Sequence, residues 1–157
     1  MAAGKWKLYE IAKEAIAKGL IDLDSDTFRI NLYLDTSNAD TLAKATIANM
    51  SQITNQVATA FGYTQNAKGV TLSVVESGGV VTVDETTNPV WTANGGSITA
   101  RFAVIYKYVD DTPANNTPLA VCLLDTTPAD ITATDGNTLT ITMNVSGVFT
   151  LSGAISN

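Results

Sequence analysis

The chain has 157 residues, a formal net charge of −6, one cysteine and no histidine. Because an acidic chain repels the phosphate backbone, we expect no nucleic-acid binding. Histidine is the usual general base and a frequent metal ligand, and the lone Cys122 cannot form an intrachain disulfide. The composition therefore predicts no catalytic residue, no metal site and no cofactor, in a chain whose length suits a single domain over 1–157.

The pattern also lacks signals for membrane insertion or secretion. No segment approaches the roughly 18 consecutive apolar residues of a membrane span. Charged side chains interrupt the first twenty residues, which argues against the apolar region of a signal peptide. We expect a chain that has no contact with membranes and stays in the cytoplasm in which it is made.

Threonine occurs 23 times and asparagine 12 times. The branched Cβ of Thr suits pleated strands, and Asn suits tight turns because it tolerates left-handed backbone. The composition therefore favours strands joined by turns.

An amphipathic helix is predicted over residues 6–18, within an N-terminal arm over 1–19. Its apolar stripe follows the helical spacing and consists of Leu8, Ile11, Ala12, Ala15 and Ile16. The polar face carries two pairs of opposite charge, Glu10 with Lys13 and Glu14 with Lys18. Gly19 is expected to end the helix, because glycine adopts left-handed backbone without steric cost.

Residues 27–34 alternate between apolar and polar side chains, which predicts a half-buried strand. In front of it, Asp22, Asp24 and Asp26 alternate as in a calcium-binding loop. Such a loop needs Gly at its sixth position and Glu at its twelfth, where this chain has Thr27 and Tyr33. A turn held by local hydrogen bonds is the preferred interpretation.

Residues 36–68 show no clean period and predict an irregular excursion from the β domain. One or two helical turns could form around Leu42, Ala45, Ile47 and Ala48, followed by a short strand. Long loops often contact partners, so this excursion is one candidate docking element.

From residue 69 onward the pattern is β. The runs VTLSVVE and VVTVD flank Ser77-Gly78-Gly79 and predict a hairpin. Further strands are predicted over residues 98–106, 118–124, 138–145 and 147–151. Strands at this spacing predict a mostly β fold, an antiparallel β-sandwich or jelly-roll-like domain over 20–157 with one N-terminal amphipathic α-helix.

The acidic side chains lie in the helix or near turns, and none has an apolar setting that would raise its pKa. A carboxylate pair for glycoside hydrolysis is therefore not indicated, and we expect no enzyme. The place of Trp91 before a turn favours core packing over a sugar-binding platform.

Trp6 allows two interpretations, because it could cap the core of its own domain or contact a neighbouring protein. Tryptophan is enriched at interface hot spots. The partner-contact candidates are therefore the residues around it, Lys5, Trp6, Lys7 and Leu8.

Four runs of the chain together show a resemblance to known proteins. They are KLYEIAKEAIAKGLIDLDSDTFRINLYL, PVWTANGGSITARFAVIYKY, PLAVCLLD and GNTLTITMNVSGVFTL. They resemble a family of tailed-bacteriophage virion proteins, small head-associated proteins of the decoration or cement type. The likeness covers both ends and the second half of the chain, whereas residues 36–88 do not align. Apolar and turn residues carry it, and it implies no catalytic residue.

The resemblance implies a β-sandwich that forms a homo-trimer on the outer face of the virion head. There it would bind the major capsid protein and stabilise contacts between capsid subunits. Two alternatives stay open, a phage tail or fibre component and a carbohydrate-binding β-sandwich. The latter needs an exposed aromatic platform, for which the chain offers Trp6, Trp91, Tyr63, Tyr106 and Tyr108.

Overall fold

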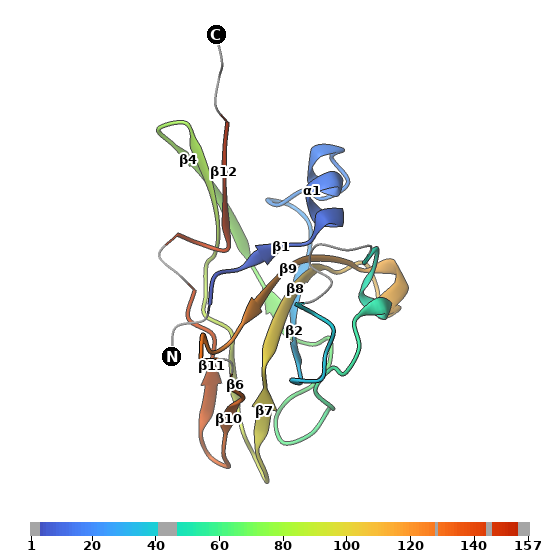
Figure 1. The fold of residues 1–157 in the computed structure, drawn as a ribbon, viewed down its shortest axis with the longest axis vertical. Coiled ribbons are helices and arrows are strands. Elements are labelled where there is room, and N and C mark those ends of the chain that lie inside the picture. Colours follow the sequence, from blue (N-terminus) through green and yellow to red (C-terminus); the bar gives the residue numbers. More distant parts are fainter. Residues whose placement is uncertain (1–3, 41–46, 128, 144–145, 154–157) are drawn as a thin grey trace.

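Antiparallel strands dominate the architecture, and one α-helix lies near the N-terminus of the described chain (Figure 1). A computed structural model describes residues 4–40, 47–127, 129–143 and 146–153. Every strand pair within these ranges is antiparallel. The prediction of a mostly β, sandwich-like domain with one N-terminal helix is confirmed.

The largest sheet forms the centre of the molecule. Its strands, in spatial order, are β1 (Lys7–Leu8), β9 (Thr117–Leu123), β8 (Phe102–Lys107), β2 (Phe28–Tyr33) and β3 (Gly69–Val70). The inner strands β8 and β9 are rich in aliphatic residues that are buried on both faces of the sheet. Continuous apolar runs of this kind are typical of strands covered on both sides.

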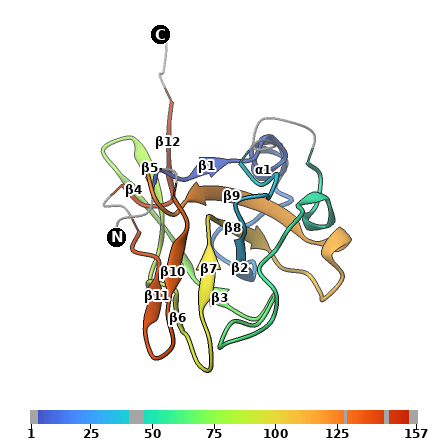
Figure 2. The ribbon, with the colours of Figure 1, turned by 60° about the horizontal axis from the view of Figure 1, so that its bottom comes forward.

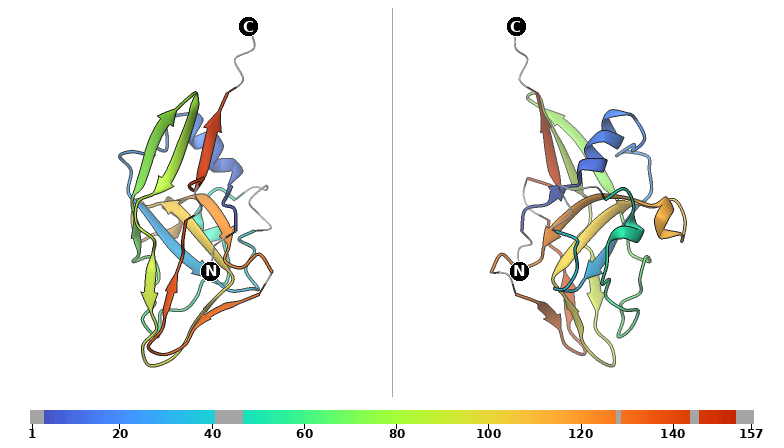
Figure 3. Two further views of the ribbon diagram at one scale, coloured as in Figure 1. Left: turned by 90° about the vertical axis from the view of Figure 1, so that its left-hand side faces the viewer. Right: turned by 45° about the vertical axis from the view of Figure 1, so that its right-hand side comes forward.

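Three smaller sheets extend from this centre. Their strands are β7 (Ile98–Ala100) with β10 (Ile131–Ala133), β6 (Val90–Thr92) with β11 (Thr138–Thr140), and β4 (Leu72–Ser77), β5 (Val80–Glu85) and β12 (Phe149–Ser152). The first two sheets gather at one end of the molecule (Figure 2). The three-stranded sheet of β4, β5 and β12, here called the ribbon, projects at the other end on the same side as helix α1 (Figure 3).

The helix begins later than the sequence predicts. Residues 7 and 8 form β1 on the edge of β9, and α1 spans Glu10–Ala17. Backbone bonds from Gly4 to Leu123 (2.8 Å) and from Tyr9 to Leu119 (3.1 Å) extend the pairing, so the edge of β9 competes successfully with the helix for these residues. Both expected charge pairs form, and Gly19 follows the helix with a φ of 67°.

Strand β2 is not half-buried as predicted, because both of its faces are covered. Asn31, on the face expected to be wet, is only 2% exposed. The excursion continues the sheet irregularly beside β2: the N–H of Ile30 donates to Lys68 (2.9 Å), that of Val57 to Leu32 (2.9 Å) and that of Leu34 to Asn55 (3.0 Å). Residues 55–68 therefore cover the edge of β2, and Asn66 covers the face predicted to be exposed, through hydrogen bonds with the side chain of Asn31.

The excursion contains a short 3-10 helix, Met50–Gln52, and a second one, Pro113–Asn115, lies between β8 and β9. Asn49 and Gln52 form a capping box at the first of them. Of the four residues expected around a helical turn, Leu42 and Ala45 lie outside the described residues, and Ile47 and Ala48 are not helical.

The hairpin prediction is confirmed, since β4 and β5 pair from Ser77 with Val80 through Gly78 and Gly79. Both glycines have positive φ, 61° and 83°, as the tight hairpin turn requires. The predicted strand 98–106 divides at Arg101 into β7 and β8. The predicted run VTLSVVE divides at Thr71 into β3 and β4, the strand predicted over 138–145 is shorter, and β1, β6 and β10 were not predicted.

Candidate functional site

The four partner-contact candidates are built into the sheet rather than displayed on a free arm. Trp6 is 8% exposed and belongs to the hydrophobic core, Leu8 is partly buried against it, and Lys7 forms an ion pair with Asp40 (2.7 Å). Lys5 is exposed. The core interpretation of Trp6 is therefore confirmed, whereas a partner contact through these residues stays a prediction.

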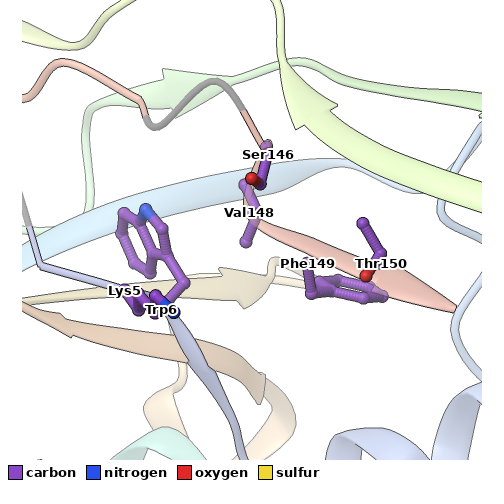
Figure 4. A pocket seen from close by; sticks show the side chains of 7 residues that line it. Lys5, Trp6, Ser146, Val148, Phe149 and Thr150 are labelled. Atoms are coloured by element: carbon purple, nitrogen blue, oxygen red, sulfur yellow. The ribbon is translucent and has the colours of Figure 1, made fainter.

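A pocket of about 280 Å³ opens beside Trp6. The N-terminal segment lines it with Lys5 and Trp6, and the chain leading into β12 lines it with Ser146, Gly147, Val148, Phe149 and Thr150. Figure 4 shows the indole on one side of this pocket, with Val148 and Phe149 across from it. The indole Nε1 of Trp6 is buried and has no hydrogen-bond acceptor in the described part of the chain.

Exposed aliphatic side chains gather on the ribbon, at residues Val74, Val75, Val80 and Leu151, here called the ribbon tip. Because alternate residues of a strand face opposite ways, the pairing places Val75 and Val80 on one face and Val74 and Leu151 on the other. Neither face is fully covered here. The adjacent valines Val74-Val75 and Val80-Val81 were the signal in the sequence, since they break the alternation of a one-sided strand.

The Asp-rich turn is held by its own carboxylates, which confirms the preferred interpretation. Asp22 accepts the N–H groups of Asp24 (3.0 Å) and Ser25 (3.2 Å). Hydrogen bonds, first from the Ser25 side chain, lower the pKa of Asp22. Asp26 accepts the N–H of Asp22 (2.7 Å) and pairs with Lys107 (2.7 Å).

The remaining chemistry-bearing groups do not converge. Among the residues that the structure describes, no three His, Cys, Asp or Glu side chains gather closely enough to hold a metal ion. Cys122 is buried, and burial raises the pKa of its thiol, so it resembles a core residue rather than a nucleophile.

Glu85 corrects the expectation that no acidic residue has an apolar setting. It is 6% exposed, and burial raises the pKa of its carboxyl. Oε1 accepts the Thr87 hydroxyl (3.0 Å), while Oε2 has no partner among the described residues. The sequence pattern did not reveal the burial of Glu85, because the segments that bury this end of its strand are distant in the sequence.

The aromatic side chains that the sequence offers for a sugar-binding platform do not form an exposed one. Trp91 is buried with its ring centroid 6.1 Å from that of Tyr63, which confirms the core interpretation. Tyr63 and Tyr106 are also buried. The guanidinium of Arg29 lies 3.4 Å from the centroid of the Tyr108 ring and covers it. A flat sugar-stacking surface is therefore missing from these positions.

No protein-family model, no curated protein and no solved structure matches the chain. Within the described residues, no helix has the length and apolar character needed to cross a bilayer.

Proposed function

We propose that this chain is a non-enzymatic structural protein of a bacteriophage virion, which binds the outer face of the head and stabilises contacts between major capsid subunits. The observation that carries the protein-contact part of the proposal is the ribbon tip. It displays four aliphatic side chains on both faces of a projecting sheet, of which Val75 is 58% exposed. Contiguous exposed apolar surface in a folded protein marks a site of contact with another macromolecule.

The ribbon tip favours a protein surface as the partner. Aliphatic side chains offer neither the cations that bind phosphate nor the aromatic faces that stack on sugars. Near the end of α1, Val74 also lines a hollow with the apolar side chains of Ile16, Ile21 and Leu23, and with Gly19, Asp22 and Asp24. Repeated docking on a lattice multiplies modest single contacts, and a homo-trimer would add to that avidity. The placement on a phage head rests on the sequence resemblance alone.

Binding to heads assembled without this chain tests the proposal. The purified protein is mixed with such heads, free protein is removed by sedimentation, and bound copies are quantified. We expect the wild-type chain to bind and Val75→Asp to reduce occupancy about tenfold or more, because burying an unpaired charge in a contact is strongly unfavourable.

Val109→Asp is the matched control, since Val109 is 55% exposed and lies outside the ribbon. It introduces the same charge at nearly the same exposure, and we expect full occupancy. Wild-type protein that does not bind heads would refute the head proposal, and electron microscopy of a labelled copy on whole virions would then test a tail or fibre location. Equal occupancy of both variants and the wild type would remove the ribbon tip from the contact.

A further inference from the structure

Phe61 is an exposed aromatic side chain on a strained turn of the excursion. It is 48% exposed, and its φ of 51° lies in the left-handed region, which is an outlier for a bulky residue. Gly62, with a φ of 89°, completes the turn, and two backbone bonds between Ala60 and Tyr63 (3.0 and 2.9 Å) close it. Such a turn favours Asn or Asp where Phe61 stands. Strain of this kind persists at sites where it serves a function.

The turn is fixed to the segment between β6 and β7, which lies at the end of the molecule opposite the ribbon (Figure 1). The carbonyl of Phe61 accepts the N–H of Asn94 (3.1 Å). The Phe61 ring packs on Gly96 so closely that a Cβ there would lie 2.4 Å from ring atom Cδ1. The ring is therefore held in place before any ligand arrives, which lowers the entropic cost of binding.

The two segments that meet at this turn carry no charged residue. Asp, Glu, Lys and Arg are absent from residues 47–67 and from residues 86–100. Lys68 borders the turn, but its ammonium donates to the Val90 carbonyl (2.7 Å) and lies 5.5 Å from the centroid of the Trp91 ring. A charged ligand would therefore find no free charge of opposite sign in these segments.

Uncharged polar groups surround the ring instead. The side chains of Thr64, Asn94 and Ser97 are exposed, and none of them forms a hydrogen bond to another described residue. Hydroxyl and amide groups both donate and accept, so they match a ligand rich in hydroxyls. The turn also forms one wall of a hollow of about 400 Å³, a volume typical of small-ligand sites, lined by Gly62, Thr64, Ala67, Lys68, Gly69 and Trp91.

We infer that this turn binds a neutral oligosaccharide, with one sugar ring stacked on Phe61 and its hydroxyls bonded to Thr64, Asn94 and Ser97. A sugar ring has an apolar C–H face, which suits the electron-rich face of an aromatic ring, and a rim of hydroxyls. The inference goes beyond the proposed function, because the exposed aliphatic side chains of the ribbon tip lie at the other end of the molecule. Both ends can be occupied at once.

The test is the binding of the full chain to an array of neutral oligosaccharides of glucose, galactose, mannose and N-acetylglucosamine, with sialylated and sulfated ones beside them. We expect neutral members to bind and acidic ones to bind no more tightly. The Kd of the best neutral member is then measured by calorimetry. Phe61→Leu should raise it about tenfold or more, because Leu keeps an apolar side chain on Gly96 and removes the aromatic face.

Two variants serve as controls for this effect. Phe61→Tyr keeps the aromatic face and should bind as the wild type does. Leu20→Asn removes a side chain that is 63% exposed and lies outside this turn, and it should leave the Kd unchanged. No binding of any neutral member, tighter binding of acidic ones, or equal affinity of Phe61→Leu and the wild type would each overturn the inference.

Head binding separates this inference from the proposed function. Phe61→Leu should occupy heads as the wild type does. Reduced occupancy of this variant, together with no binding to the array, would assign Phe61 to a protein contact and overturn the oligosaccharide site. A wild-type chain that binds neutral oligosaccharides but no heads would refute the head proposal and support this site.

Discussion

Replacing Tyr63 with Phe should destabilise the protein by about 1–3 kcal/mol, the penalty for leaving a buried donor without its acceptor. The phenol oxygen accepts the backbone N–H of Leu32 (3.0 Å) and the side-chain N–H of Gln56 (3.2 Å). Leu32 is fully buried in β2, so water cannot take the place of the phenol. The excursion pairs with β2 on either side of this position, and the hydroxyl fills the gap in the ladder.

Urea unfolding followed by circular dichroism measures the effect. The midpoint should fall while the slope with denaturant stays constant, and Tm should fall by about 2–4 °C for each kcal/mol lost. Tyr108→Phe is the control, because its hydroxyl donates to the exposed Asp111 (2.9 Å) and the change should stay within about 0.5 kcal/mol. If the two variants are equally stable, the hydroxyl of Tyr63 does not complete the ladder and the reasoning fails.

Two further predictions concern Glu85 and Gly62, a glycine of the excursion, with Gly69 of β3 as a control. Burial raises the pKa of Glu85, so the folded state binds the proton more tightly than the unfolded state, and wild-type stability falls as pH rises through the raised value. Glu85→Gln should therefore gain stability relative to the wild type between about pH 4 and about pH 7, measured by urea titration; a constant difference would contradict this. Gly62→Ala should lower Tm by several degrees, because its Cβ would lie 2.1 Å from the Thr92 carbonyl oxygen at a φ of 89°. Gly69→Ala meets nothing within 4 Å and should leave Tm nearly unchanged.

Periodicity correctly predicted the strands whose packing partners are close in the sequence. It failed for strands that are buried by segments far along the chain. The hairpin of β4 and β5 is specified by its own turn glycines, so it could be read directly. In contrast, Asn31 reads as a wet position, yet it is buried because its side chain donates to Asn66 (2.6 Å) and accepts the N–H of Asn66 (3.1 Å). A polar residue in a strand can be buried when another segment supplies its hydrogen-bond partners. The local sequence pattern does not show which segment does so.

At the candidate site, too, the local sequence pattern did not reveal a contact between the N-terminal segment and a distant strand. The spacing of Ile11, Ala12 and Ala15 correctly indicated a docked helix, but nothing near residue 6 reveals that β9 has an open edge there. Tyr9 is fully buried, and its hydroxyl donates to the Ala39 carbonyl (3.0 Å). Removing residues 1–18 would therefore open the core as well as any contact surface, so point substitutions are the sharper probe of function.

The exposed apolar surface of the ribbon favours self-association of the free protein, and the charge of the protein opposes this only in part. Its tip is apolar on both faces, and both outer strands of its sheet, β4 and β12, lack lysine and proline. Such a surface favours uncontrolled association. The net charge of −6 opposes this, because copies repel one another once they approach within about a Debye length, roughly 8 Å at physiological salt. A partner that offers apolar cover without adding negative charge avoids that repulsion, which makes specific docking more favourable than random aggregation.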